Sequence, residues 1–148
     1  PEYVGKLPFE IVHISEFLAK ELPACGIDFG AAPDGAVTYQ DPCRLGRMAG
    51  IYDAPRELIH LLSGASFQEM PNSRENAVCC GTSAWMQCSS CSKTMQTQRL
   101  EEAQSTGAST LITACDKCRI HLTCAKTNTD LNIEVIDLYS LLAKGMEA

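Results

Sequence analysis

The sequence has few aromatic residues and no long hydrophobic run. Aromatic residues make up 6% of the 148 positions, and only one of them is tryptophan. A helix that crosses a bilayer needs roughly 18 or more apolar residues in succession, and no stretch approaches that length. The N-terminus also lacks the basic and apolar pattern of a signal peptide. We therefore expect no membrane span and a cytoplasmic location, with any membrane association arising through a partner subunit.

Positive charge is scarce as well. The chain has 12 Lys and Arg residues against 18 Asp and Glu residues, which gives a net charge of -6, and it contains no basic block. Because nucleic-acid binding depends on neutralising phosphates, this balance argues against a nucleic-acid partner. The chain also has no glycine-rich phosphate loop after a strand, no Ser-His-Asp arrangement and no evident pair of carboxylates. A hydrolase therefore has no support.

Helix-like and strand-like patterns alternate along the chain. The expected helices cover residues 7–23, 53–64, 83–107, 115–126 and 138–145, and the expected strands cover residues 36–40, 66–70, 109–114 and 133–138. Strands separated by helices need crossover connections. The pattern therefore predicts an α/β fold with a mostly parallel sheet flanked by helices.

The N-terminal part differs from the rest in lacking most of the cysteines. Four apolar residues share one face of its expected helix: Ile11, Ile14, Leu18 and Leu22. We expect residues 1–35 to form this helix and a linker, and residues 36–148 to form a cysteine-rich unit, within one structural domain. The first residue is Pro rather than Met, so we expect a processed subunit or a fragment of a longer protein.

Cysteine is the residue type that stands out. The nine cysteines are Cys25, Cys43, Cys79, Cys80, Cys88, Cys91, Cys115, Cys118 and Cys124. Disulfide frameworks belong mostly to short secreted domains, and this chain is neither short nor visibly secreted. An odd count also leaves one thiol over. The cysteines therefore indicate metal binding or redox chemistry.

Three groups of cysteines come after predicted strands or short apolar steps. Cys43 comes after the strand at 36–40, and Cys115 comes after the strand at 109–114 and opens a helix that carries Cys118. Cys79 and Cys80 end the apolar step before Gly81. In open α/β sheets ligands bind at the carboxyl ends of the strands, where helix N-termini also favour thiolates. We expect a metal site at that edge of the sheet.

The count of five thiols at this edge limits the kind of centre. Zinc takes four ligands in a tetrahedron, and an ordinary iron–sulfur cube takes four cysteines. Adjacent thiols such as Cys79 and Cys80 suit a centre with more than one metal atom, because each can reach a different atom. A structural zinc site that uses four of the same thiolates remains the alternative.

Several other residues near these cysteines have open roles. Cys88 and Cys91 lie one turn apart on an expected helix, either as two buried small residues or as a dithiol that approaches the centre. His121 is either a surface histidine or a hydrogen-bond donor to sulfur. The expected border of the site carries three cations, Arg44, Arg47 and Lys117, and two cysteines are expected to play no part, Cys25 and Cys124.

The cysteine pattern resembles the cysteine-rich CCG domain. Cys43 is followed by 35 residues and then by Cys79-Cys80-Gly81, and a further 33 residues lead to Cys115-x-x-Cys118. The flanking segments VTYQDPCRLGR, GIYDAPRELI, RENAVCCG and TLITACDKC are also similar to blocks of that family. The resemblance covers roughly residues 36 to 140. Such domains occur in the B and D components of heterodisulfide reductase, and in iron–sulfur subunits that act with glycolate, lactate, glycerol 3-phosphate and fumarate.

The resemblance implies a Rossmann-like cysteine-rich domain whose five cysteines hold a noncubane 4Fe-4S cluster. It further implies electron transfer and disulfide reduction, with flavin- or ferredoxin-type redox subunits as partners and a thiol or disulfide as substrate. Some copies of the domain hold Zn2+ instead, which would make this chain a structural or docking module of a redox complex. The chain has one CCG motif and no ferredoxin-type cysteine run, and Arg44 stands where the family often has histidine. It therefore resembles half of a working reductase.

Overall fold

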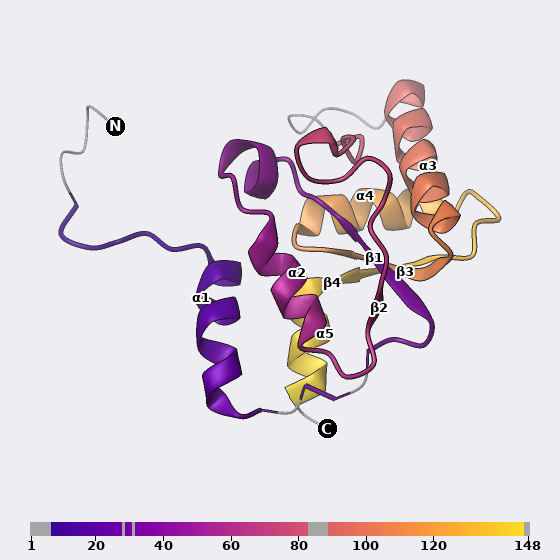
Figure 1. Cartoon of the computed structure of the whole chain (residues 1–148). Helices are drawn as coiled ribbons and strands as arrows, with labels where there is room; N and C mark the ends of the chain where they lie inside the picture. The colour runs from indigo at the N-terminus through magenta and orange to yellow at the C-terminus, as the bar shows by residue number, and fades with distance from the viewer. Residues whose placement is uncertain (1–6, 28, 31, 83–88, 147–148) are drawn as a thin grey trace.

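A single parallel sheet organises the chain (Figure 1). The computed structural model describes residues 7–27, 29–30, 32–82 and 89–146. Within these residues the sheet has four strands in the order β2-β1-β3-β4, and every pairing is parallel. The strands are β1 (Ala36–Gln40), β2 (Ser66–Phe67), β3 (Ala108–Thr113) and β4 (Glu134–Asp137). The predicted α/β fold with a mostly parallel sheet is confirmed.

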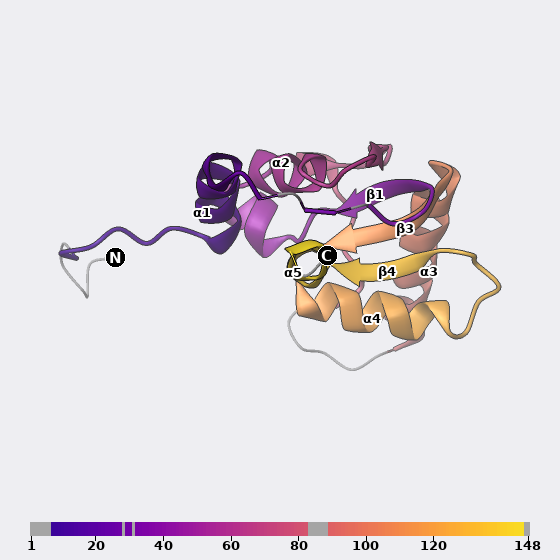
Figure 2. The ribbon, with the colours of Figure 1, turned by 90° about the horizontal axis from the view of Figure 1, so that it is seen from below.

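Helices cover both faces of this sheet (Figure 2). One face packs against α1 (Ile14–Glu21), α2 (Asp53–His60) and α5 (Leu138–Met146), and the other packs against α3 (Ser90–Ser105) and α4 (Asp116–Lys126). Neighbouring residues of β3 divide between the two cores, because successive strand side chains point to opposite faces. Ile112 joins the α1–α2–α5 core, whereas Leu111 joins the α3–α4 core, and both are fully buried.

The strand order places a natural binding edge between β1 and β3. The chain leaves β1 toward β2 on one side and leaves β3 toward β4 on the other, so the order reverses between these two central strands. Ligands in doubly wound sheets bind in the crevice outside the carboxyl ends of the strands at such a reversal. Gln40 and Thr113 are register partners that end the two strands together. The segments that leave these two strand ends are therefore brought to one place.

The first helix is shorter than the sequence pattern predicts. The expected helix covers residues 7–23, but α1 begins at Ile14, after His13, whose ring nitrogen accepts the backbone N–H of Ser15 at 3.2 Å. This N-cap ends the helix on its N-terminal side. Ile11 therefore lies outside the helix and is 77% exposed. Of the predicted face, Leu18 and Leu22 pack in the core, whereas Ile14 is exposed. The buried residues of α1 are Ser15 and Ala19.

The other elements agree with the prediction except at their ends. The strand expected at 66–70 is reduced to Ser66–Phe67, and the helix expected at 83–107 is described only from Ser90, where Ser89 caps it by accepting the N–H of Ser92. None of the helices in the described part of the chain is long and apolar enough to cross a membrane.

Candidate metal centre

All five cysteines of the predicted site line one cavity. It has a volume of about 490 Å³ and lies beyond the carboxyl ends of β1 and β3. The cysteines are Cys43, Cys79, Cys80, Cys115 and Cys118, and three cations share the lining, Arg44, Arg47 and Lys117. The structure thus brings together three chain segments that are far apart in the sequence. The positions of the cysteines after predicted strands suggested that they lie close together, and the order of the strands places them there.

Cys43 stands at the start of an irregular turn. Asp41 and Pro42 carry the chain out of β1 and are buried, while Cys43 itself is exposed at the cavity. The next residues, Arg44–Met48, form a π-helical turn. Such turns are rare and often occur at functional sites. Here the turn places Cys43, Arg44 and Arg47 around the same opening, although the sequence pattern gave no sign of it.

The Cys79-Cys80-Gly81 segment is held close to α3. Cys80 is 5% exposed, whereas Cys79 is half-buried. Gly81 has φ +75°, and a Cβ there would lie 2.7 Å from the backbone oxygen of Ser92 and 2.7 Å from Cγ of Gln96. Glycine alone combines this backbone conformation with so close an approach. The residue after the doubled cysteine is therefore fixed by packing as well as by conformation.

Cys115 sits at the N-terminus of α4. It is the N-cap residue of the helix, and its sulfur lies near the backbone N–H groups of Cys118 and Lys117 without forming a capping hydrogen bond. The Cys118 thiol and these two N–H groups lower the pKa of Cys115 to about 5, against the opposing effect of burial. Helix N-termini stabilise negative charge in this way. The position of Cys115 at the helix N-terminus therefore favours its thiolate form.

Cys80 and Cys118 meet below the cavity. Their sulfurs are 3.0 Å apart, and the Cys118 thiol donates to Cys80. This hydrogen bond, helped by Thr82, lowers the pKa of Cys80 to about 6 although burial opposes the shift. The pKa of Cys118 is raised, because its proton is shared with Cys115 and Cys80 and the group is buried. Ligand thiols must lose their protons to bind metal, so a cation here would replace the Cys118 proton.

The cations of the cavity lie close enough to affect one another. Partial desolvation and the charge of Arg44 lower the pKa of Lys117, while the Cys115 thiolate opposes this shift. Arg47 is anchored by its guanidinium, which donates to the backbone oxygen of Ala77 at 2.8 Å. These positive groups offset the charge that several thiolates would bring to one place.

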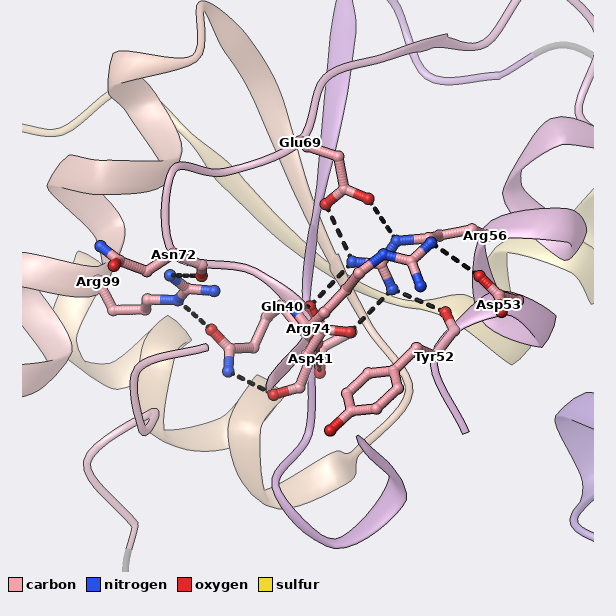
Figure 3. A network of polar contacts seen from close by, with 10 residues as sticks. Gln40, Asp41, Tyr52, Asp53, Arg56, Glu69, Asn72, Arg74 and Arg99 are labelled. Carbon is pink, nitrogen blue, oxygen red and sulfur yellow. Dashed lines mark hydrogen bonds and ion pairs between the residues drawn. The ribbon is translucent and has the colours of Figure 1, made fainter. Parts of the chain in front are cut away.

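A network of polar contacts joins the segments that carry Cys43 and Cys79 (Figure 3). At its centre, the Arg56 guanidinium of α2 forms two hydrogen bonds with the Asp41 carboxylate, at 2.8 and 2.9 Å. On the other side of β1, the Gln40 side chain accepts from Arg99 and donates to the backbone oxygen of Val78 at 3.3 Å. Sequence reasoning missed this network. The sequence shows Arg56 within the segment PRELI, but only the structure shows that this arginine is buried and which residues it contacts.

Among the residues that the structure describes, neither His121 nor any of the other cysteines lines the cavity. Cys25, Cys91 and Cys124 are exposed, so the expectation that Cys91 is buried was wrong. Cys88 lies outside the described residues. The ring of His121 lies 3.5 Å from the side-chain amide of Gln96 on α3.

The donors around the cavity suit a thiolate-bound metal centre. Among the described residues, no three His, Cys, Asp or Glu side chains converge closely enough to bind one metal ion. The five thiols line a hollow instead, with the N-terminus of α4 and three cations beside them. Such a donor set fits an iron–sulfur group, which is held by cysteine thiolates and carries negative charge.

Comparison with known proteins identifies the family. The model of the CCG cysteine-rich domain matches residues 37–123, which include all five cysteines of the cavity. The chain belongs to the CCG cysteine-rich domain family. This CCG chain is 34% identical over 149 residues to the D component of dihydromethanophenazine:CoB–CoM heterodisulfide reductase from Methanosarcina barkeri, in an alignment that covers 99% of the chain and 36% of that relative.

Two further relatives of this CCG chain have other names. It is 29% identical over 143 residues to the probable iron–sulfur-binding oxidoreductase FadF of Bacillus subtilis, covering 93% of the chain and 20% of FadF. It is 27% identical over 146 residues to the B component of fumarate reductase (CoM/CoB) from Methanothermobacter marburgensis, covering 96% of the chain and 28% of that relative. The chain therefore spans only about a third or less of the relatives' length.

Proposed function

We propose that this CCG chain binds an iron–sulfur cluster as part of an oxidoreductase of the heterodisulfide reductase type. The observation that carries the proposal is the cavity lined by five cysteines. The relatives support it, since one is named a heterodisulfide reductase subunit and another an iron–sulfur-binding oxidoreductase. The ligands are Cys43, Cys79, Cys80, Cys115 and Cys118, and the cluster is of the noncubane 4Fe-4S type.

The size and shape of the site favour a cluster over a single zinc ion. A zinc ion holds four thiolates at about 2.3 Å and needs no hollow of its own. Here the five cysteines are spread over the lining of a cavity of about 490 Å³, in which Cys43 is exposed while Cys80 and Cys118 are buried. A centre with several metal atoms uses ligands spread in this way. It also gives adjacent cysteines separate atoms to bind.

When bound, the cluster supplies one-electron redox chemistry next to the open side of the cavity. Reduction of a disulfide consumes two electrons and two protons and yields two thiols, so the electrons must come from a redox partner of flavin or ferredoxin type. The chain's own residues hold the cluster and shield it on the floor of the cavity. Arg44 and Lys117 at the lining stabilise thiolates formed there.

The proposal is tested by metal analysis of the chain purified without oxygen. We expect a brown protein that contains iron and acid-labile sulfide. A colourless protein with one tightly held zinc ion per chain, prepared with iron available, would contradict the cluster and identify the chain as a structural or docking module. Electron paramagnetic resonance and Mössbauer spectra of the iron protein then separate a noncubane cluster from an ordinary cube.

A further inference from the structure

The buried guanidinium of Arg56 has a partner for each of its donors. Arg56 is 5% exposed, and its Nε and Nη2 atoms donate to the two oxygens of Glu69, the second at 2.9 Å. Its Nη1 and Nη2 atoms donate to the two oxygens of Asp41, and Nη1 also donates to the backbone oxygen of Tyr52 at 2.7 Å. Arginine has five N–H donors in a rigid fork, and all five are used here.

The partners of Arg56 belong to the two segments that lead to cysteines. Asp41 is 3% exposed and lies two residues before Cys43, with only the rigid Pro42 between them. Glu69 begins the segment that runs to Cys79 and Cys80. Because Arg56 fixes the position of Asp41, it also restricts the position of Cys43 two residues later.

Asp41 also holds the second segment directly. Its Oδ2 atom accepts the backbone N–H of Arg74 at 2.8 Å, and Arg74 has a positive φ of 54°. Two further contacts fix the residues after it, from Arg47 to the oxygen of Ala77 and from Gln40 to the oxygen of Val78. The segment that leads to Cys79 is thus held against the end of β1. Both this segment and Arg56 contact the Asp41 carboxylate, so the orientation of that carboxylate affects both.

We propose that Arg56 is a positioning residue that sets the Cys79-Cys80 segment relative to Cys43, although Arg56 does not line the cavity. This inference rests on the proposed function, because the position of these cysteines matters if they bind a cluster. The contacts of Arg56 themselves do not depend on that function. A buried ion pair adds little stability compared with apolar residues of similar volume. Its fork geometry, however, allows one arrangement of the two carboxylates and of the segments attached to them.

Arg56→Lys tests the role of geometry because it keeps the charge and removes the fork. The metal-free, reduced chain is treated with N-ethylmaleimide, and the rate at each cysteine is followed by peptide mass spectrometry. We expect the Cys79-Cys80 peptide to react several-fold faster than in the wild type, with Cys91 and Cys124 unchanged because both are exposed and lie outside the cavity. After reconstitution with ferrous iron and sulfide, we expect faster loss of iron to a chelator and an altered spectrum.

Asp53→Asn is the matched control. It removes the exposed ion pair between Asp53 and the Arg74 guanidinium, at 2.7 Å, and leaves the Arg74 N–H bond to Asp41. We expect wild-type alkylation rates and wild-type retention of iron. Circular dichroism and the thermal midpoint confirm that each variant is folded.

The outcomes separate the two proposals. A folded Arg56→Lys chain with wild-type alkylation of Cys79 and Cys80 overturns the positioning role. If that variant does not fold, Glu69→Gln takes its place, because it weakens the network at its more exposed end, and a smaller acceleration at the same peptide is expected. A wild-type chain that takes up no iron and sulfide overturns the proposed function alone, since the alkylation rates of the metal-free chain still decide the role of Arg56.

Discussion

The sulfur atoms of Cys80 and Cys118 lie 3.0 Å apart, although the two residues are 38 positions apart in the chain. Cys80 comes from the loop before α3 and Cys118 from the first turn of α4, and both belong to the hydrophobic core under the sheet. The floor of the cavity is therefore part of the core. Residues that hold this floor in place should affect both the stability of the fold and the metal centre.

Gly81→Ala should destabilise the chain more than Gly64→Ala. Both glycines have φ +75°, so each substitution incurs roughly 1–2 kcal/mol of backbone strain. An alanine Cβ at Gly64 meets nothing within 4 Å, whereas at Gly81 it would lie 2.7 Å from the backbone oxygen of Ser92. Overpacking adds about 1–3 kcal/mol. Urea unfolding of the reduced, metal-free chains measures the difference, and equal losses would show that α3 moves aside without cost.

Arg99→Met should destabilise the chain by about 3–5 kcal/mol, because it removes one partner of a buried ion pair. The Arg99 side chain is fully buried and donates to Gln40, to Glu102 at 2.6 Å and to the backbone oxygen of Asn72 at 2.9 Å. Without it, the Gln40 oxygen and Oε2 of Glu102 lose the Arg99 donor, while Oε1 of Glu102 keeps its two donors from Asn72.

The control for Arg99 is Arg119→Met on α4. The Arg119–Asp116 pair has a separation of 3.9 Å, and its side chains are 43% and 81% exposed. Exposed pairs contribute about 0–1 kcal/mol, so denaturant unfolding should show little change. A loss at Arg99 no larger than that at Arg119 would mean that the buried network is replaceable by apolar contacts.

Much of the fold could be predicted because its signals are local. The strand at Ala36–Gln40 is rich in β-branched and aromatic residues, and α4 comes soon after β3, so Cys43 and Cys115 could be assigned to strand ends. The meeting of the cysteines could then be inferred from the rule that ligands bind at the carboxyl edge shared by parallel strands.

Other features depend on contacts that no local pattern records. The start of α1 is set by the His13 cap, so Ile11, which the apolar spacing placed on the helix, lies outside it. The π-helical turn after Cys43 and the partners of Arg56 depend on segments brought together only in the folded chain. Resemblance could supply the ligand pattern, but the polar network beneath it required the structure.

The isolated chain should show little or no disulfide reductase activity with a simple reductant. It spans 36% of the length of its heterodisulfide reductase relative, so most of that relative's length has no counterpart in the aligned region. We expect activity to appear when a flavin- or ferredoxin-type electron donor subunit is added, which an anaerobic assay of thiol release measures. Full turnover by the chain alone would show that one CCG unit suffices.

Single substitutions of the doubled cysteine separate the two kinds of metal centre. In a cluster with five thiolate ligands, Cys79 and Cys80 bind different irons, so Cys79→Ser and Cys80→Ser should each change the spectrum or stop assembly. A zinc site needs four thiolates, so one of the five cysteines should be dispensable. Neighbouring side chains rarely reach one small ion together, which makes Cys79 or Cys80 the natural spare.

The controls for this experiment are Cys91→Ser and Cys124→Ser. Both cysteines are exposed and neither lines the cavity, so iron and sulfide content should match the wild type. Cys80 is buried beside Cys118 and Cys79 is half-buried. Loss of stability alone would therefore affect Cys80→Ser more, whereas loss of a ligand affects both variants. Unchanged iron content and spectrum in the Cys79→Ser chain would rule out the five-thiolate cluster, because the half-buried thiol could then leave without consequence for the metal.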